Sequence, residues 1–486
     1  MLLIDRILQA VERNADAPAF IANDRPMSYR AMRALLSNTI RNLHERGVRP
    51  GQVIALTMSQ APLHVIASLA LARLGAISVP VFPVADAGAR ADLYRRFDIG
   101  AVLTDREDCG APGVEVILLR TVKARGDEAE LGHGGFTPVG ETPLRIGLTS
   151  GTAGPPKGIL HTHDMYVRRL DRRFYGDTPR PRVIPPSLHI TAAMQLACYA
   201  LCAGGTVVFP TGYDGANLLA AIRRHGVTHL MMPPANLAPM LGLLEGDTPA
   251  FPSITHLRLV GTAPAPAFVD LVRRKFSPNI YAPYSTMEVG VIAMATPETL
   301  ASVPRSSGRV APGARLEVIG EDGRVLPPGQ SGEIRVAVEG MPTGYVGRDV
   351  DTSRFRDGWF YPQDRGYVSP EGFVFVEGRS DEIIDVGGRK VAPKYAESVL
   401  EGHPSVREAA VFAYEAGDEG LHIAAAIVPA GPLDWKALDQ YALGRLEVFA
   451  PRRYYEVGEI PRNALGKILR QELEDTVRDT AAKLTR

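Results

Sequence analysis

The sequence has few cysteines, no net charge and no unbroken apolar run long enough to cross a membrane. Cys109, Cys198 and Cys202 are too few for a disulfide framework, and the last two, in an apolar stretch, are expected to be small buried hydrophobes. The 54 Lys and Arg equal the 54 Asp and Glu, so no global field points to nucleic acid or an acidic partner. Internal repeats and low-complexity segments are also lacking.

The longest apolar region, residues 65–84, is interrupted by Arg73, Gly75 and Pro80. It therefore predicts a buried helix followed by a strand and not a membrane span. Asp5 and Arg6 interrupt any apolar core at the start of the chain, so we expect no signal peptide. The expected location is the cytoplasm.

The length of 486 residues predicts more than one domain, because single cores stop growing at roughly 250–300 residues. Predicted strands alternate with predicted helices from residue 53 to residue 118, which indicates an α/β fold with a largely parallel sheet. Short strands with turns predict a β-rich subdomain at about 305–378. We expect a large N-terminal domain of mixed α/β sheets, residues 1–378, and a small mobile α+β domain, residues 379–486, with a hinge near 379–382.

A glycine-rich loop with one lysine, residues 149–158, follows the apolar run Leu144, Ile146 and Leu148. Glycines permit the positive φ angles with which backbone N–H groups of such a loop approach phosphate oxygens. The loop is not the familiar P-loop, because Lys157 lies between a proline and a glycine. Taken alone, it fits a phosphate-binding loop and a flexible surface loop equally well.

Four further segments follow the lysine loop in a fixed order. They are residues 284–288 (YSTME), 359–364 (WFYPQD, followed by GRSD at 378–381), 387–391 (GGRKV) and 461–467 (PRNALGK). With the lysine loop, this ordered set resembles the acyl-adenylate-forming superfamily of acyl- and aryl-CoA synthetases, nonribosomal peptide synthetase adenylation domains and luciferases. The resemblance covers essentially the whole chain.

The resemblance implies an ATP-dependent acid–thiol ligase. Its carboxylic acid substrate would form an acyl-adenylate with release of pyrophosphate, and a thiol would then take the acyl group. ATP and Mg²⁺ would be the cofactors, and the acceptor would be CoA or the phosphopantetheine of an acyl carrier protein. No covalent nucleophile on the protein is required, so catalysis would rest on positioning and charge stabilisation.

The resemblance also implies the nucleotide-binding residues. The β- and γ-phosphates would be held by Thr149, Ser150, Gly151, Thr152, Gly154 and Lys157. The adenine, ribose and adenylate would be contacted by Gly261, Thr262, Ala263, Tyr284, Ser285, Thr286, Met287, Asp364 and Arg379. Among these, Asp364 would accept hydrogen bonds from both ribose hydroxyls, although it could also merely cap a turn.

Further roles follow from the same resemblance. Glu288 would bind Mg²⁺, a hard cation that prefers oxygen ligands, although it could also be a solvated surface acid. Lys467 would bridge the substrate carboxylate and the α-phosphate, a role that suits a compact charge on a flexible stem. Asp381 would be the hinge, and Gly387 and Gly388 would line the thiol channel.

His189 matches a family position at which acyl- and aryl-CoA synthetases often carry histidine, although it could also be a packed core histidine. No carboxylate occurs from Ser187 to Gln195, which disfavours an α-amino acid substrate. An apolar acyl pocket is one interpretation of the nearby methionines, which are equally ordinary core residues. The arginines at 168, 169, 172 and 173 could contact CoA phosphates, but a solvated helix face is preferred.

The chain departs from the family pattern at Ser285, Met287 and Gln363, which stand where glycine, a phosphate-binding threonine and glycine are usual. Three hypotheses follow. The first is an acyl- or aryl-CoA ligase, and the second is a stand-alone enzyme that loads an acyl group onto a carrier protein. The third, which the departures motivate, is a non-catalytic adenylate-binding protein.

Overall fold

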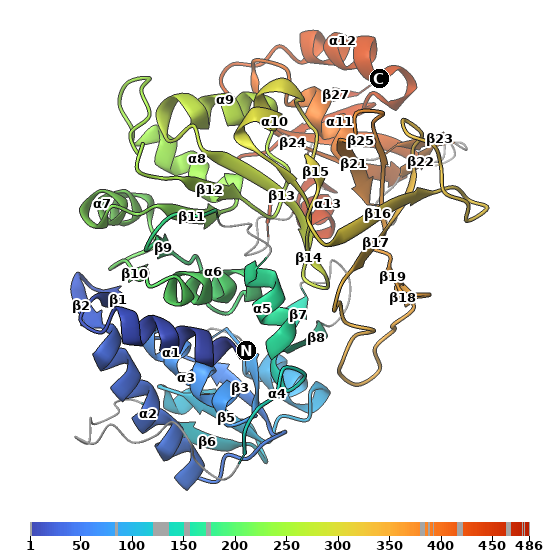
Figure 1. Ribbon diagram of the computed structural model, residues 1–486. Helices are drawn as coiled ribbons and strands as arrows, with labels where there is room; N and C mark the ends of the chain where they lie inside the picture. The colour runs from blue at the N-terminus through green and yellow to red at the C-terminus, as the bar shows by residue number, and fades with distance from the viewer. Residues whose placement is uncertain are drawn as a thin grey trace.

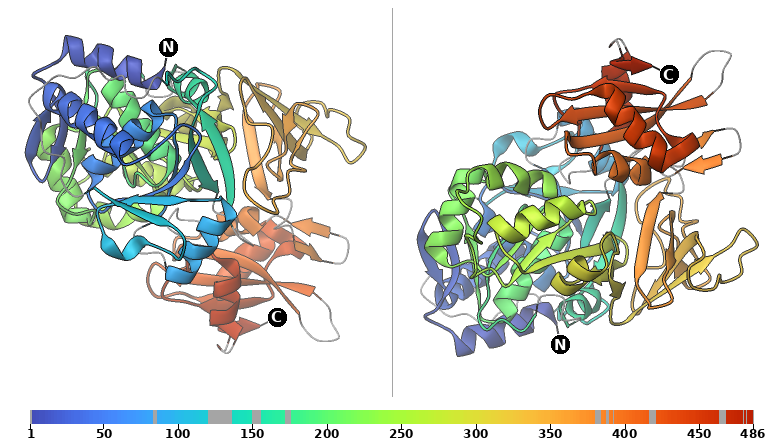
Figure 2. Two further views of the ribbon diagram at one scale, coloured as in Figure 1. Left: turned by 90° about the horizontal axis from the view of Figure 1, so that it is seen from below. Right: turned by 90° about the horizontal axis from the view of Figure 1, so that it is seen from above.

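The computed structural model describes residues 2–82, 86–119, 136–149, 156–171, 176–379, 384–386, 389–391, 393–415, 421–462, 468–478, 480 and 482–485. Two mixed sheets with helices around them form the large body, and a β-rich part and the C-terminal part lie together at one side of it (Figures 1 and 2). Within the described residues, no helix is long and apolar enough to cross a membrane.

The shorter sheet of the large body is parallel except for its last strand. Its order is β6 (Glu115–Leu118), β5 (Ala101–Thr104), β3 (Val53–Thr57), β4 (Ile77–Pro80), β7 (Pro143–Thr149) and β8 (Lys157–Thr162). The antiparallel pair β7–β8 carries the lysine loop.

The longer sheet has a parallel centre and antiparallel edges. Its order is β15 (Arg309–Val310), β14 (Gly290–Ala295), β13 (Ile280–Thr286), β12 (His256–Leu259), β11 (His229–Met232), β9 (Arg182–Ile184), β10 (Thr206–Phe209), β1 (Pro18–Ala22) and β2 (Arg25–Ser28). The parallel strands β9 to β13 end at the same edge, where open α/β sheets bind ligands.

Two apolar helices form the centre of the main core. Nearly every residue of α3 (Ala61–Arg73) and α6 (Thr191–Cys202) is buried, because each is apolar on all sides. α3 packs on β3, β4 and β7, whereas α6 packs on β9 and β10 of the other sheet. In Figure 1, α6 lies between the strands of the two sheets.

The remaining helices cover the sheets. They are α1 (Leu3–Arg13), α2 (Tyr29–Glu45), α4 (Ala87–Arg96), η1 (Glu107–Cys109), α5 (His163–Asp171), α7 (Gly215–His225), α8 (Pro234–Gly242), α9 (Pro266–Lys275) and α10 (Pro297–Ser302). Of these, α4, α8, α9 and α10 were not predicted from the sequence. The last three each begin at a proline, which has no backbone N–H and suits the first turn of a helix.

The β-rich part and the C-terminal part match the predicted pattern. The first contains β16 (Ala314–Ile319), β17 (Gly332–Val338), β18 (Phe355–Arg356), β19 (Trp359–Phe360), β20 (Asp364–Val368) and β21 (Val374–Arg379). The second contains β22 (Ile384–Val386), β23 (Arg389–Val391), α11 (Pro393–Leu400), β24 (Val406–Glu415), β25 (Leu421–Pro429), α12 (Trp435–Leu446), η3 (Glu447–Phe449), β26 (Arg453–Glu456), α13 (Arg470–Arg478) and β27 (Leu484–Thr485).

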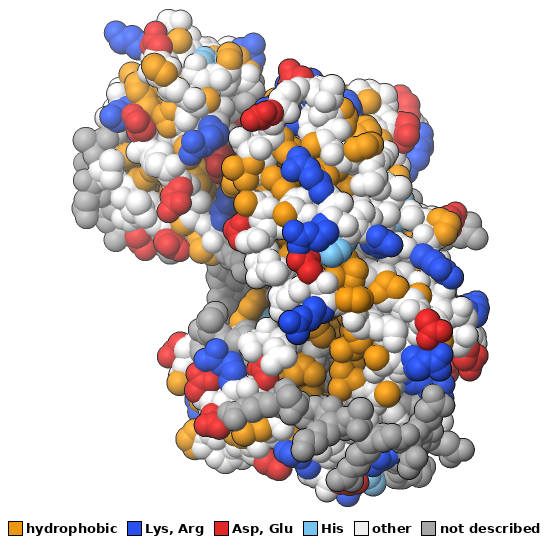
Figure 3. Space-filling view, turned by 90° about the vertical axis from the view of Figure 1, so that its left-hand side faces the viewer, with side chains coloured by type: hydrophobic (Ala, Val, Ile, Leu, Met, Phe, Trp, Pro, Cys, Tyr) orange, Lys and Arg blue, Asp and Glu red, His pale blue; other side chains and the backbone are white. Residues whose placement is uncertain are grey.

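The predicted fold class is confirmed: a large N-terminal domain of mixed α/β sheets accompanies a small α+β C-terminal domain. The boundary at 378 and the hinge near 379–382 stay predictions. Lys and Arg are interspersed with Asp and Glu on the face shown in Figure 3, as expected for a chain with equal numbers of both charges.

Candidate active site

The hairpin β7–β8 holds both ends of the lysine loop. Thr149 pairs with Lys157 across the hairpin, and the Thr149 hydroxyl donates a hydrogen bond of 3.2 Å to the Lys157 carbonyl. The ammonium of Lys157 lies 4.8 Å from the centre of the Tyr345 ring. The other predicted loop residues, Ser150, Gly151, Thr152 and Gly154, lie outside the described residues.

Glu288 lies in the turn between β13 and β14 and is only 7% exposed. Its Oε1 accepts a hydrogen bond of 2.7 Å from the Tyr345 hydroxyl, and its backbone carbonyl accepts one of 2.8 Å from Arg169. Burial, followed by the neighbouring carboxylate, raises the pKa of Tyr345, so this phenol remains a donor. The alternative that Glu288 is a solvated surface acid is therefore wrong.

Tyr345 is held beside the lysine loop by main-chain hydrogen bonds. Its neighbour Val346 exchanges two of them with Gly158 on β8, at 2.8 and 3.2 Å. This bridge brings the segment after β17 onto the hairpin. It therefore fixes the Tyr345 ring between Lys157 and Glu288.

Asp364 is the first residue of β20 and is 8% exposed. Its Oδ2 accepts a hydrogen bond of 2.5 Å from the Tyr284 hydroxyl, and it stands opposite Arg379 in the β20–β21 register. Burial and then Asp364 raise the pKa of Tyr284, while Arg379 and Glu288 influence it less. Tyr284 therefore forms one polar cluster with Asp364 and Arg379, which lie at least 80 residues further along the chain, and the charge of Glu288 also acts on the Tyr284 phenol.

Arg379 is anchored by the segment that precedes Asp364. Its Nη1 donates to the Pro362 carbonyl at 3.0 Å and its Nη2 to the Gln363 side chain at 3.4 Å. Gln363, which stands where glycine is usual, has a φ of 63°. That left-handed conformation favours glycine, so the departure from the family pattern carries a backbone cost here.

The residues between Tyr284 and Glu288 have different surroundings. Ser285 is exposed, and the Thr286 hydroxyl accepts a hydrogen bond of 3.3 Å from the Val289 N–H, which closes the turn. The Met287 sulfur would lie 3.2 Å from a Cβ at Gly147, so it packs against β7. The Thr286 hydroxyl therefore serves the turn, and Met287 brings a thioether to the place of a phosphate ligand.

Gly261, Thr262 and Ala263 follow the carboxyl end of β12. Gly261 has a φ of 91°, which only glycine adopts without strain, and Gly261 and Ala263 are exposed. The predicted adenine segment thus lies at the edge of the longer sheet that is expected to bind ligands.

His189 lies just before α6 in a group of rings. Its ring stacks on Phe82 and meets His64 edge to face, with ring centres 4.8 Å apart in both pairs. Burial, and then the nearby guanidinium of Arg145, lower the pKa of His189 to about 4. The imidazole is therefore neutral at pH 7, which fits the predicted site and a core histidine alike.

The sequence reasoning missed Tyr345, Arg169 and Arg145. Tyr345 carries no distinguishing local pattern, whereas Arg145 is a single charge within an apolar strand and was a usable signal. Arg169 belongs to the arginine cluster for which a solvated face was preferred. That preference is wrong for Arg169, which bonds to Glu288, and Arg168 instead forms an exposed ion pair with Glu339.

The carboxylate ligands available in the site suit a metal ion that is coordinated mainly by the phosphates of a nucleotide. Among the described residues, no three His, Cys, Asp or Glu side chains group together as a complete metal site. Glu288 supplies a carboxylate, one oxygen of which accepts a hydrogen bond from Tyr345. Mg²⁺ is commonly held by one or two carboxylates and substrate phosphates, so this arrangement fits it.

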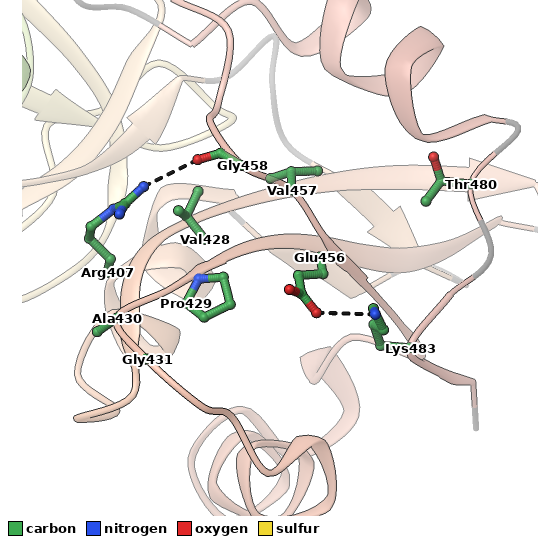
Figure 4. A pocket seen from close by; sticks show the side chains of 10 residues that line it. All are labelled: Arg407, Val428, Pro429, Ala430, Gly431, Glu456, Val457, Gly458, Thr480 and Lys483. Atoms are coloured by element: carbon green, nitrogen blue, oxygen red, sulfur yellow. Dashed lines mark hydrogen bonds and ion pairs between the residues drawn. The ribbon is translucent and has the colours of Figure 1, made fainter.

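A cavity of about 670 Å³ lies elsewhere, on the C-terminal sheet (Figure 4). Its two cations are paired: Arg407 donates to the Gly458 carbonyl at 3.1 Å, and Lys483 lies 3.2 Å from Glu456. It shares no residue with the predicted nucleotide site, and its chemistry offers no anion site. Lys467, Asp381, Gly387 and Gly388 lie outside the described residues.

Two family models match this chain. The AMP-binding enzyme model matches residues 7–346, and the AMP-binding enzyme C-terminal domain model matches residues 395–467. The chain belongs to the AMP-binding enzyme family. The predicted resemblance to the acyl-adenylate-forming superfamily is thereby confirmed.

Relatives of this AMP-binding enzyme span nearly its whole length. It is 27% identical to the indoleacetate–CoA ligase of Aromatoleum aromaticum, over 93% of this chain and 94% of that one. It is also 27% identical to the fatty acid–[acyl-carrier-protein] ligase ScoC of Streptomyces coeruleorubidus, over 94% and 93%. The o-succinylbenzoate coenzyme A synthetase of Bacillus subtilis, solved with ATP and magnesium, superposes with a TM-score of 0.85, 25% identity and coverage of 97% and 99%.

The predicted enzyme class is confirmed at this level. The AMP-binding enzyme is an ATP-dependent ligase that activates a carboxylic acid as its adenylate and passes the acyl group to a thiol. The third hypothesis, a non-catalytic adenylate-binding protein, loses its support.

Proposed function

We propose that this enzyme is an acyl- or aryl-CoA ligase that works with ATP and Mg²⁺. The observation that carries the proposal is the pair of contacts at the two ends of the segment 284–288. Tyr284 bonds to Asp364, which stands opposite Arg379, and Glu288 bonds to Tyr345 beside Lys157 of the lysine hairpin.

In the first step the substrate carboxylate attacks the α-phosphorus of ATP, and pyrophosphate leaves. Thr149 and Lys157 would hold the β- and γ-phosphates with Ser150, Gly151, Thr152 and Gly154. Asp364 would accept hydrogen bonds from the ribose, with its carboxylate oriented by Tyr284 and Arg379 beside it. These groups are fixed before the nucleotide arrives, which lowers the cost of reorganisation.

Glu288 would hold Mg²⁺ through the oxygen that Tyr345 leaves available. The bound ion would neutralise negative charge on the transferring phosphates. Gly261, Thr262 and Ala263 would line the adenine, and Ser285, Thr286 and Met287 would border the adenylate. Lys467 would supply the positive charge between carboxylate and α-phosphate.

In the second step a thiolate attacks the acyl carbonyl, and AMP leaves. Asp381 would be the hinge of the domain movement, Gly387 and Gly388 would line the thiol path, and His189 would border the acyl group. Loading of a carrier protein is the second candidate, which the similarity to ScoC favours. A cytoplasmic enzyme agrees with both candidates.

The experiment is acid-dependent ATP–pyrophosphate exchange over aryl, short-chain, medium-chain and dicarboxylic acids, with wild type and Lys467→Ala. We expect exchange with one class of acid and a loss of about 10²–10³-fold in the variant, since it removes a charge aimed at the transition state. Lys483→Ala, which removes a paired lysine of the same domain, is the control and should exchange normally.

Retained exchange in Lys467→Ala would overturn the assigned role of that lysine. Silence with every acid would overturn the proposed ligase. The acceptor is then decided by supplying CoA or a phosphopantetheinylated carrier protein to the active acid: rapid CoA thioester formation without a carrier supports the first candidate and contradicts the second.

A further inference from the structure

Arg145 is a buried cation on β7 of the shorter sheet. It lies on β7, is 1% exposed and stands opposite the fully buried His161 of β8. Its Nη2 donates to the backbone carbonyls of Leu188 and His189, at 2.9 and 3.1 Å. Its Nε and Nη1 have no hydrogen-bond partner among the described residues. A buried guanidinium with two such nitrogens is costly unless something completes it.

Other buried polar side chains without hydrogen-bond partners among the described residues lie near Arg145. A Cβ at Gly147, two residues along β7, would lie 2.6 Å from the Thr191 hydroxyl and 2.9 Å from Nε2 of His161. Within the part of the chain that the structure describes, neither of these atoms has a partner, nor has the amide nitrogen of Gln195, one turn further along α6. Polar side chains of β7, β8 and α6 therefore meet where hydrogen-bonding capacity is left over.

Within the described part of the chain, no carboxylate is among the groups that influence the charge of Arg145. Burial lowers its pKa, and the other described groups that influence it, Tyr166 and Cys198, are neutral near pH 7. Arg145 in turn contributes to the lowered pKa of His64, His161 and His189, whose main cause is burial. A cation among neutral imidazoles is a setting that favours an anion.

The position of this group relates it to the acyl substrate. Arg145 bonds to the carbonyl of His189, the residue assigned to the acyl site, and α6 begins immediately after it. The Met287 sulfur lies near the same Cβ position of Gly147 as the Thr191 hydroxyl and His161 Nε2. The group of Arg145, His161 and Thr191 thus adjoins both His189, proposed for the acyl side, and Met287, proposed for the adenylate side.

We propose that the acid activated by this enzyme carries a second anionic group, a carboxylate or a sulfonate, and that Arg145 binds it together with His161 and Thr191. The inference rests on the proposed function and specifies its substrate. Charge-assisted hydrogen bonds to the remaining guanidinium nitrogens would satisfy them and select the acid.

The test uses pairs of acids that differ only in the second charge. Pyrophosphate exchange is measured with adipate against hexanoate, glutarate against valerate, 3-sulfopropionate against butyrate, and terephthalate against 4-methylbenzoate. We expect wild type to favour the doubly charged member of at least one pair by more than about tenfold. In Arg145→Met, kcat/KM for that acid should fall by about 10²-fold or more, while its uncharged counterpart changes by less than about threefold.

Two measurements separate selection from a purely structural role. Arg145→Lys keeps the charge and should retain a preference for the doubly charged acid, and thermal unfolding with and without ATP reports whether each variant is folded. Equal losses for both members of a pair in Arg145→Met would overturn the inference and leave Arg145 as a support of the Leu188–His189 carbonyls.

Wild-type selectivity decides the matter even where Arg145→Met does not fold. If the uncharged member is preferred in every pair, the inference fails and the proposed function stands. If no acid of any kind supports exchange, the proposed function itself fails.

Discussion

Two buried polar regions of this enzyme differ in how their charges are satisfied. In the carboxylate region, Glu288 and Asp364 each accept a hydrogen bond from a tyrosine hydroxyl, at 2.7 and 2.5 Å. In the arginine region, Arg145 keeps two nitrogens without a partner among the described residues. Each carboxylate of the first region is therefore oriented by a tyrosine before a ligand binds, whereas the second region holds donors that the proposed second anionic group of the acid would satisfy.

The difference follows the chemistry expected at each region. ATP is common to all members of the family, so its ligands can be held rigidly by side chains that never change partners. The acid differs between relatives. A buried donor without a partner is unfavourable, so an acid that can accept its hydrogen bond is favoured over one that cannot. In the proposed site, the fold thus combines carboxylates that already accept a hydrogen bond on the nucleotide side with open donors on the substrate side.

The largest loss of activity should come from removing a charge in the carboxylate region. Asp364→Ala deletes the proposed ribose ligand and leaves the buried Tyr284 hydroxyl without its acceptor. We expect kcat/KM for ATP in pyrophosphate exchange to fall by about 10²–10³-fold, because a buried group is left unpaired and the nucleotide loses its anchor. Asp322→Ala, which removes an exposed aspartate bonded to the Arg324 backbone N–H, is the control. A loss no greater than that of the control would show that Asp364 only caps β20.

A smaller effect should follow from breaking a hydroxyl–carboxylate pair without removing the charge. Tyr345→Phe leaves Oε1 of the buried Glu288 without its donor, and hydrogen bonds to charged groups contribute about 1.5–3 kcal/mol. We expect the free energy of unfolding, measured by urea denaturation without ligand, to fall by about 2 kcal/mol.

The control for this variant is Tyr395→Phe, which removes the hydroxyl of a tyrosine that is 46% exposed on α11. Its free energy of unfolding should change by less than about 0.5 kcal/mol. Equal stability of the two variants would mean that the carboxylate region is not held together by Tyr345, and its contrast with the arginine region would disappear.

The sequence predicted the proposed ligands in the carboxylate region but not the side chain that holds Glu288 in place. Glu288, Asp364 and Arg379 lie in ordered motifs, and the structure brings Asp364 and Arg379 into register. Tyr345 follows Glu288 by 57 residues, and no local pattern links them, because their contact depends on the bridge from Val346 to β8. Long-range packing of this kind leaves no periodicity in the sequence.

The helices show the same distinction between local and long-range information. The apolar segments that form α3 and α6 could be predicted because their composition alone requires burial. α8, α9 and α10 are short and begin at prolines, which also punctuate loops, so their helical state could not be read from composition. Arg145 was visible as a charge in a strand, but only the covering of β7 by neighbouring helices makes it a buried one.

The smallest effect concerns the pH dependence of stability, which should come from the arginine region. His189 has a pKa of about 4 in the folded chain and an ordinary pKa of about 6.5 when unfolded. Between these values the unfolded chain binds a proton that the folded chain does not, so stability is full above pH 6.5 and falls as the pH decreases toward 4. The tyrosines of the carboxylate region, whose pKa values are raised, stay protonated over this interval.

The measurement compares wild type with His189→Asn by urea denaturation at a series of pH values from 4 to 7. At pH 5 the free energy of unfolding of wild type should change more steeply, by about 1 kcal/mol per pH unit, since one buried imidazole contributes about that slope. His64 and Arg145 face the His189 ring and remain in both proteins, so their contributions cancel to first order. Parallel pH profiles would mean that the pKa of His189 is the same in the folded and the unfolded chain, so that burial does not keep this imidazole neutral below pH 6.5. A second cation would then stand beside Arg145 at acidic pH, which contradicts the description of this region as one cation among neutral imidazoles.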